Sequence, residues 1–280
     1  MKIKQWKLVL VALLLVLGWG LATNSSAKAA TDQPATVFVH GLQGSHKSTD
    51  TMIADLSNRY PGTKKVMTIN VQPNGSLQTR GHVTSIKHPL VQVNFINNSA
   101  STTTNAKWLG SALKYLKTKQ GVNSVDLVAH SAGNVAVYQL LSSRPSSIPT
   151  VKKFVILAGP FDGVLSLNDT ANKNKVNRQN HDEPSIKYPA NSYYPSYQQL
   201  EKMGKSFPKN VQVMNVYGNV GDGTNSDTLV TNASALSVNY LLRHQNTPVV
   251  NHCWRSSQAT HSGLHRSQKV DNWIANFLWK

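Results

Sequence analysis

The sequence predicts an α/β fold in which a mainly parallel sheet is covered by helices on both faces. Short apolar segments typical of buried strands alternate along the chain with segments whose apolar residues recur every three or four positions. This alternation is typical of parallel strands joined by crossover helices. The chain has 280 residues, a length that suits one such domain with a well-buried core.

Each element is expected from its own pattern. Strands are predicted for apolar or alternating segments at residues 36–39, 65–71, 89–96, 125–128, 152–157 and 211–218. Helices are predicted for amphipathic segments at residues 49–60, 106–119, 135–141 and 270–279. A turn is predicted at Pro73-Asn74-Gly75.

The segment Ala129-His130-Ser131-Ala132-Gly133 follows a predicted strand and precedes a predicted helix. A serine on such a sharp turn is held in a strained backbone conformation with its hydroxyl exposed, an arrangement called a nucleophile elbow. The close packing of strand and helix requires small residues on both sides, here Ala129 and Gly133. We therefore predict Ser131 as a nucleophile and the amide of Ala132 as one donor to a developing oxyanion.

An earlier predicted strand, at residues 36–39, runs into His40-Gly41-Leu42-Gln43-Gly44. Enzymes with a nucleophile elbow take their second oxyanion donor from a loop after an early strand. We predict the amide of Leu42 in this role, with Gln43 as the next candidate, and Gly41 would let a substrate approach the backbone. Taken alone, the segment also fits an ordinary turn with a buried histidine.

Carboxylates that could orient a catalytic histidine are scarce, because the chain contains only twelve Asp and Glu residues. The order serine, acid, histidine places the acid after a later strand. Asp227 follows the strand predicted at 211–218, and the return to apolar sequence at Thr228-Leu229-Val230 suits a fixed carboxylate. Asp222 stands between two glycines and fits a turn or a cation ligand, so it is the second candidate. Asp162, after an earlier strand, is the third.

The base is expected on a loop just before the last helix, where the chain reads His261-Ser262-Gly263-Leu264-His265. The chain has ten histidines, so one histidine alone indicates little, but two in this loop are informative. His261 stands at the start of the loop, from which an imidazole can point back to the sheet edge. We predict His261 as the base and expect His265 to pack against or cap the helix.

With these motifs the chain resembles lipase-like α/β hydrolases, and in particular the secreted cell-surface hydrolases of Gram-positive bacteria. Small bacterial lipases of this superfamily also have alanine before the His-Ser pair, as Ala129 is here. Their acid lies in a serine- or glycine-rich loop, as Asp227 does, and their base begins a His-x-Gly-Leu segment, as His261 does. Asn134 departs from the family pattern, because many relatives have a second glycine there. The matching segments are 37–44, 127–134, 226–230 and 261–264.

These residues, together with the resemblance, imply an α/β-hydrolase fold that cleaves carboxylic esters of small or lipid substrates. His261 would take the proton of Ser131, and Asp227 would fix the imidazole tautomer. The amides of Leu42 and Ala132 would hold the oxyanion, and no metal or organic cofactor is required. A second hypothesis is a non-catalytic cell-wall-binding protein on the same scaffold, which a missing triad member would favour. No member is missing from this sequence.

Residues 1–30 have the three parts of a secretory signal peptide: a lysine-rich start, an apolar run, and Ala27-Lys28-Ala29 as a cleavage site. We therefore expect a leader at 1–30, a hydrolase domain at 31–280, and a secreted or loosely cell-surface-associated protein without stable membrane insertion. The alternative is an uncleaved anchor, although the apolar run is short for a membrane span, which needs roughly 20 residues.

The chain is strongly basic, with a net charge of +17, or +13 without residues 1–30. Such a charge favours polyanionic partners, which for an exported protein would be anionic cell-wall polymers or lipid head groups. Nucleic acid is not expected, because the sequence has no recognition motif. A general effect on solubility explains the charge equally well. The one cysteine, Cys253, can form no internal disulfide and is expected to be buried as a small apolar residue.

Residues 162–208 interrupt the alternation of strands and helices. The segment is rich in Asn, Ser, Tyr and Lys, with tyrosines at 188, 193, 194 and 197. We expect it to be a cap or lid inserted over the active site. A plain surface excursion is the alternative.

Overall fold

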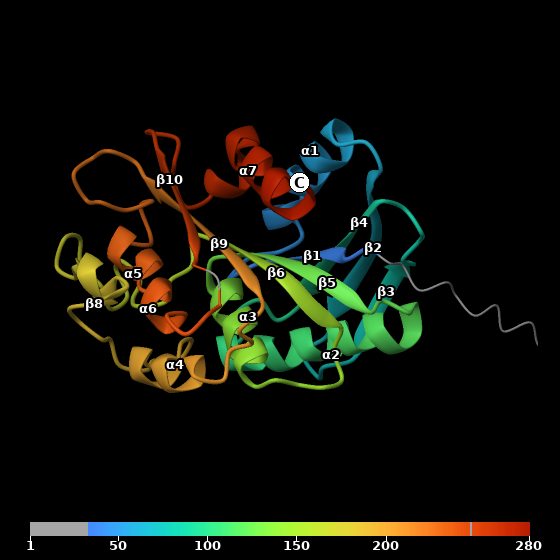
Figure 1. Ribbon diagram of the computed structural model, residues 1–280, viewed down its shortest axis with the longest axis horizontal. Helices are drawn as coiled ribbons and strands as arrows, with labels where there is room; N and C mark the ends of the chain where they lie inside the picture. Colours follow the sequence, from blue (N-terminus) through green and yellow to red (C-terminus); the bar gives the residue numbers. More distant parts are fainter. Residues whose placement is uncertain (1–32, 247) are drawn as a thin grey trace, which may run out of the picture.

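The computed structural model describes residues 33–246 and 248–280, so the leader expected at 1–30 lies outside the described residues (Figure 1). Its centre is an eight-stranded sheet in the order β10-β9-β6-β5-β1-β4-β2-β3. The strands are β1 (Ala35–Val39), β2 (Thr63–Val71), β3 (Leu77–Gly81), β4 (His88–Phe95), β5 (Ser124–His130), β6 (Thr150–Leu157), β9 (Gln212–Asn219) and β10 (Val250–Arg255). Neighbouring strands pair in parallel except β3, which is antiparallel to β2.

Helices cover both faces of the sheet, which confirms the predicted α/β-hydrolase architecture. On one face lie α1 (Lys47–Arg59) and α7 (Gln268–Trp279), and on the other lie α2 (Thr102–Gln120) and α3 (Ala132–Ser142) (Figure 1). Because successive strand residues point to opposite faces, each strand contributes to both cores. Leu127 of β5 packs in the core under α2 and α3, whereas Val128 packs in the core under α1 and α7.

The strand predicted at 89–96 is confirmed as β4, whereas the burial predicted for Cys253 is wrong. All eight residues of β4 are buried, so the alternation at 89–96 does not separate a buried face from an exposed one. Both faces of this strand are covered, as is usual in a parallel sheet. Cys253 is half-buried rather than buried, because it lies on β10, which is the edge strand and has a neighbour on one side only.

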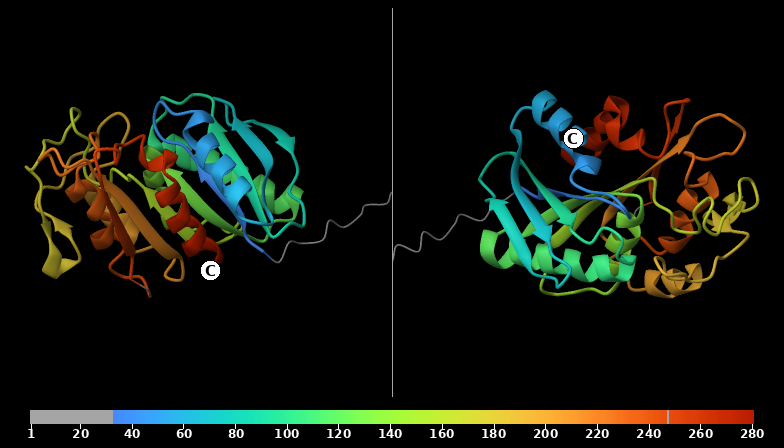
Figure 2. Two further views of the ribbon diagram at one scale, coloured as in Figure 1. Left: turned by 90° about the horizontal axis from the view of Figure 1, so that it is seen from above. Right: turned by 180° about the vertical axis from the view of Figure 1, so that it is seen from behind.

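Parallel strands end at the same edge of the sheet, and this places three of the predicted motifs together. The loop at 40–46 follows β1, Ser131 follows β5, and Asp227 follows β9. Ligands of open α/β sheets bind at this carboxyl edge. Figure 2 shows the strands running side by side toward it.

The segment 162–208 contains only short elements: β7 (Val176–Asn177), η1 (Arg178–Asn180), β8 (Glu183–Pro184) and α4 (Tyr197–Gly204). Buried polar contacts tie it to the chain that follows β9. The Thr231 hydroxyl donates to Asp169 Oδ2 at 2.7 Å, and the Asp162 amide donates to Ser234 Oγ at 3.1 Å. The segment therefore packs against the loop that carries Asp227.

The remaining elements are short or peripheral. They are α5 (Asn232–Leu236), α6 (Val238–Leu241) and η2 (Leu264–Arg266). Within the described ranges, no helix combines the length and the apolar character needed to span a membrane.

Candidate active site

Ser131 stands between β5 and α3 with φ 55° and ψ −133°. Non-glycine residues rarely adopt such angles, which cost on the order of 1–3 kcal/mol and persist only where the surroundings enforce them. Here the Ser131 amide donates to the carbonyl of Leu157 on β6 at 2.9 Å, and the Ser131 carbonyl accepts from the amide of Asn134 at 2.9 Å. The turn thus has the backbone geometry of a nucleophile elbow.

The side chain of Asn134 holds the same turn from beneath. Its Nδ2 donates to the carbonyl of Ser131 at 2.9 Å and to the carbonyl of Leu157 at 2.8 Å, and the residue is fully buried. A glycine at this position could make neither bond. In the sequence, Asn134 stands out only as a departure from the family pattern. A polar residue in an otherwise apolar helix start was the signal that could have revealed its role.

Two glycines let the elbow and the loop after β1 meet. A Cβ on Gly133 would lie 2.7 Å from the carbonyl oxygen of His40. A Cβ on Gly41 would lie 2.7 Å from the Cβ of Ser131 and 3.0 Å from the amide nitrogen of Ala132. The backbone after β1 therefore rests directly on the serine turn, where an oxyanion loop has to be.

The amides of this loop differ in whether they are free to donate to a substrate oxygen. The Gln43 amide donates to the carbonyl of Asn98 at 2.7 Å, whereas the Leu42 amide makes no hydrogen bond to any described residue. Ala132 is the first residue of α3, and the first amides of a helix have no acceptor within it. The side chain of Asn98 also donates to the carbonyl of Gly44 at 2.9 Å, which fixes the loop around Leu42.

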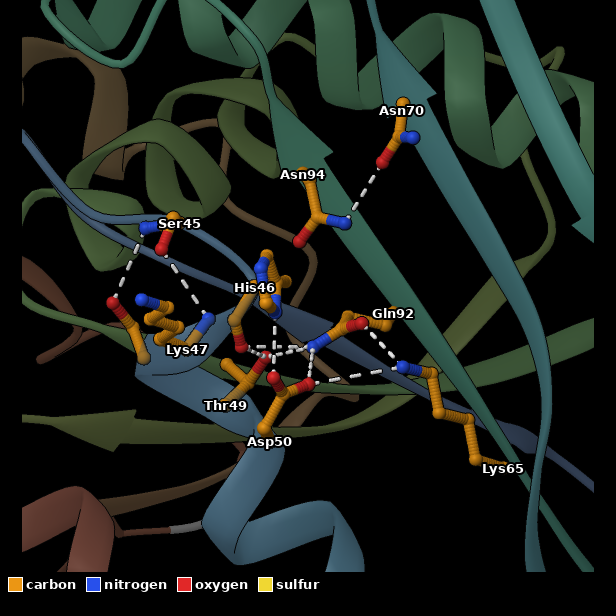
Figure 3. Close-up of polar contacts among 10 residues, drawn as sticks. Ser45, His46, Lys47, Thr49, Asp50, Lys65, Asn70, Gln92 and Asn94 are labelled. Carbon is orange, nitrogen blue, oxygen red and sulfur yellow. Dashed lines mark hydrogen bonds and ion pairs between the residues drawn. The ribbon is translucent and has the colours of Figure 1, made fainter.

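The far end of the loop is fixed to β4 by Gln92 (Figure 3). Its Nε2 donates to Thr49 Oγ1 at 2.7 Å, to Asp50 Oδ1 at 2.9 Å and to the carbonyl of His46 at 3.0 Å. Its Oε1 accepts from Lys65 at 2.5 Å. The segment from His40 to the start of α1 is therefore held at both ends.

Asp227 and His261 are in direct contact. His261 Nδ1 donates to Asp227 Oδ2 at 2.9 Å, and the His261 amide donates to the Asp227 carbonyl at 2.6 Å. The other carboxylate oxygen, Oδ1, accepts from the amides of Leu229 at 2.9 Å and Val230 at 2.7 Å, and Asp227 is almost fully buried. With its proton on Nδ1, neutral His261 has Nε2 free to accept a proton.

The other carboxylates considered from the sequence lie elsewhere. Asp222 Oδ1 accepts from the amide of Thr224 at 2.9 Å in an exposed turn. The carboxylate of Asp162 accepts from Asn174 Nδ2 at 2.8 Å and from the amide of Tyr188 at 2.9 Å, and burial raises its pKa to about 7. Among the described residues, neither makes a hydrogen bond to His261. No group of three His, Cys, Asp or Glu side chains in this part of the chain is placed to hold a metal ion.

Three further histidines surround the site, and each is engaged elsewhere. His40 Nε2 accepts from the amide of Phe95 at 2.9 Å. His130 Nε2 donates to the carbonyl of His261 at 3.0 Å, with the two rings 4.7 Å apart. The ring of His265 lies 4.6 Å from His130, and burial lowers its pKa to about 4. Burial also lowers the pKa values of His40 and His130, which favours the neutral imidazole at all three positions.

His130 brings His261 to the elbow, because it directly precedes Ser131 in the chain. Within the described ranges, no hydrogen bond joins Ser131 to His261. Such contacts are often long in enzymes without substrate and shorten when substrate binds. The structure therefore brings the five predicted site residues to one edge of the sheet and joins two of them, Asp227 and His261, by a hydrogen bond.

The sequence also matches a known family over nearly its whole length. Residues 23–280 fit the model of the family described as "Alpha/beta hydrolase of unknown function (DUF915)". The chain belongs to this family. No curated protein matches the sequence.

Solved structures agree with the family on the fold. A gene product of Listeria innocua is 25% identical with a TM-score of 0.75, over 89% of this chain and 95% of that one. A protein of Lactobacillus plantarum, provisionally named a cell surface hydrolase, is 18% identical with a TM-score of 0.68, over 89% and 90%. The lipase BlEst2 of Bacillus licheniformis is 16% identical with a TM-score of 0.52, over 88% and 92%.

Proposed function

We propose that the protein is a serine hydrolase that cleaves carboxylic esters through an acyl-enzyme intermediate. The observation that carries the proposal is the 2.9 Å contact between His261 Nδ1 and Asp227 Oδ2, on the sheet edge that also carries the strained Ser131 turn. An acid that orients a histidine beside an activated serine is the arrangement of serine hydrolases on several unrelated folds.

Each residue has a defined task in this reaction. His261 Nε2 accepts the proton of the Ser131 hydroxyl as its oxygen attacks the ester carbonyl carbon. Asp227 stabilises the imidazolium that forms, and the amides of Leu42 and Ala132 hold the tetrahedral oxyanion. His261 then gives the proton to the departing alcohol oxygen. Water, deprotonated by His261 in turn, releases the acid and restores Ser131.

The segment 162–208 is proposed as the cap that shapes the substrate site. Support comes from its buried ties to the chain after β9, through Asp169 and Thr231. The site itself is secluded, since Ser131 is 8% exposed and the His261 side chain 12% exposed. Such limited exposure suits a small ester or a single acyl chain better than a bulky substrate.

Covalent labelling tests the nucleophile. A fluorophosphonate probe should label the wild-type protein once, and Ser131→Ala should remove the label. Ser111→Ala, an exposed serine on α2, is the matched control and should label as the wild type does. Full labelling of the Ser131 variant would rule out this nucleophile.

A set of p-nitrophenyl esters of increasing acyl length tests the substrate class. Turnover of at least one ester, lost in Ser131→Ala, is the expected outcome. Protein that is folded but inactive on every ester and unlabelled by the probe would instead support the non-catalytic cell-wall-binding alternative.

We also propose that residues 1–30 are removed on export and that the protein is held loosely at the cell surface by its basic charge. Such attraction weakens with salt, because the Debye length falls from about 10 Å at 0.1 M to about 3 Å at 1 M. Washing intact cells with concentrated salt should release protein that begins near Thr31. Protein that stays with the membranes and retains Met1 would show that the leader is an anchor.

A further inference from the structure

A groove runs along α2 and α3 and continues to the start of β6. Two adjoining hollows of about 460 and 610 Å³ form it, and they share Pro145 and Ile148. Thr150 and Val151, at the start of β6, line its far end. Ser131, Asp227 and His261 line neither hollow, and they follow strand ends at the opposite edge of the sheet. The groove is therefore separate from the proposed active site.

The lining of the groove is apolar where it adjoins the core. Leu140 and Leu141 of α3 and Ile148 of the following loop are largely buried aliphatic side chains on this lining. Prolines 145, 149 and 208 add rigid apolar surface. A ligand with carbon segments could lie against such a lining without losing hydrogen bonds to water.

The walls of the groove are basic on both sides. Lys107, Lys114 and Lys117 of α2 line one wall. Arg144 and Lys209 line the other. Lys107 and Lys114 are seven residues apart on the same helix, which separates them by about 10 Å along its axis. No Asp or Glu lines either hollow, and α2, α3 and the loop that follows α3 contain none.

These cations are not neutralised by the protein. None of the five forms an ion pair with a described residue. Lys117 donates to the carbonyls of Ser146 and Ile148, both at 2.9 Å. Arg144 donates to the carbonyl of Ser206 at 2.5 Å. These two cations therefore fix the chain segments that line the groove. The side chains of Lys107, Lys114 and Lys209 are exposed and have no hydrogen-bond partner in the described part of the chain.

We propose that this groove binds a linear polyanion whose phosphate groups are joined by short carbon segments. Three unpaired lysines on two walls would contact successive phosphates, and the carbon segments would lie on the apolar lining. A groove admits a chain, whereas a flat bilayer could not reach its lining. The proposal thus assigns part of the net charge of +13 to a specific binding site, which is separate from the ester chemistry at Ser131.

Binding of a fluorescent oligomer of glycerol joined by phosphodiesters tests the proposal. The groove variant is Lys107→Gln/Lys114→Gln/Lys209→Gln. Its matched control is Lys64→Gln/Lys173→Gln/Lys269→Gln, which removes three exposed lysines on β2, in the segment 162–208 and on α7. The groove variant should bind about tenfold more weakly at low salt. The plot of its log affinity against log salt concentration should be less steep by about 2, as expected when three phosphate contacts are lost. The control should stay within twofold of wild type.

A single acid placed in the groove provides a second test. Ser147→Glu should weaken oligomer binding, whereas Gln78→Glu, at an exposed position of β3, should not. Equal losses in both triple variants would show that only the total charge matters and would overturn the site. Loss of binding to phosphatidylglycerol vesicles in the groove variant, with no loss for the oligomer, would also overturn it in favour of a membrane surface. Fluorophosphonate labelling of Ser131 reports separately on the proposed hydrolase, so one proposal can fail without the other.

Discussion

The α-carbon of Gly41 rests against the side chain of Ser131, so closely that a Cβ on residue 41 would lie 2.7 Å from the Cβ of the serine. The same added atom would lie 3.0 Å from the amide nitrogen of Ala132. One contact thus sets both the position of the proposed nucleophile and the spacing of the two proposed oxyanion donors. Any side chain at residue 41 has to displace one loop from the other.

Gly41→Ala should therefore lower the turnover of esters by about 10² or more, the usual effect of losing one oxyanion donor. The melting temperature should fall as well, because the loop is held at both ends and cannot move away from the serine turn without strain. Steady-state kinetics with a short-chain ester, together with thermal unfolding, will measure both effects. Turnover within threefold of wild type would show that the two loops do not act together.

Asn134→Ala should destabilise the elbow by about 2 kcal/mol, because two buried hydrogen bonds to the carbonyls of Ser131 and Leu157 are lost. For a domain of this size, the melting temperature should fall by about 4–8 °C. Asn276→Ala, at an exposed position of α7 whose side chain makes no hydrogen bond to a described residue, should change the melting temperature little. Equal shifts in the two variants would contradict the role assigned to Asn134.

His261→Ala should lower kcat/KM for esters by about 10⁴ or more, as loss of the base does in other serine hydrolases. His265→Ala should leave most of the activity, because the His265 ring packs on His130 and is placed to support the loop rather than to move a proton. Kinetics on the two variants will rank them. If His265→Ala were the more damaging change to kcat, the base would have to be reassigned.

Asp227→Asn should cost about 10⁴ in kcat, because an amide at this position would favour the wrong tautomer of His261. Asp222→Asn should have little effect, since Asp222 lies in an exposed turn bonded to Thr224. The rate at which a fluorophosphonate labels Ser131 in each variant gives an independent ranking of the two carboxylates. A larger loss in the Asp222 variant would move the acid role to that residue.

Asp271 on α7 should by itself contribute a loss of stability as pH rises from about 4 to about 8. Burial and the neighbouring carboxyl of Asp55 raise its pKa from 3.8 to about 8. Across that window the folded protein holds a proton that the unfolded chain has lost, so the free energy of unfolding falls as pH rises. Asp271→Asn should remove this contribution, so the free energy of unfolding of the variant relative to the wild type should be higher at pH 8.5 than at pH 5, as urea unfolding at the two pH values will show. Asp222→Asn, at an exposed aspartate, should leave the dependence on pH unchanged.

Local pattern was sufficient to predict the long central elements. The strands β1, β5, β6 and β9 and the helices α1, α2, α3 and α7 lie within a few residues of their predicted ranges, because each is long enough to repeat its period. The edge strands β3 and β10 were missed. The residues of β3 are mostly exposed and those of β10 are exposed or half-buried, so both strands carry little apolar pattern and owe their conformation to a neighbouring strand.

The sequence by itself determined the residue types at the site and their order along the chain, since a small residue beside Ser131 and an apolar run after Asp227 are visible without a fold. Only the tertiary structure decided which groups meet. Gln43 was set apart from Leu42 by the carbonyl of Asn98, and Asn134 gained its role from carbonyls on the turn and on β6. The basic groove likewise joins side chains from α2 with side chains from distant loops. Each of these depends on distances across the sheet and its helices, which periodicity along one element cannot encode.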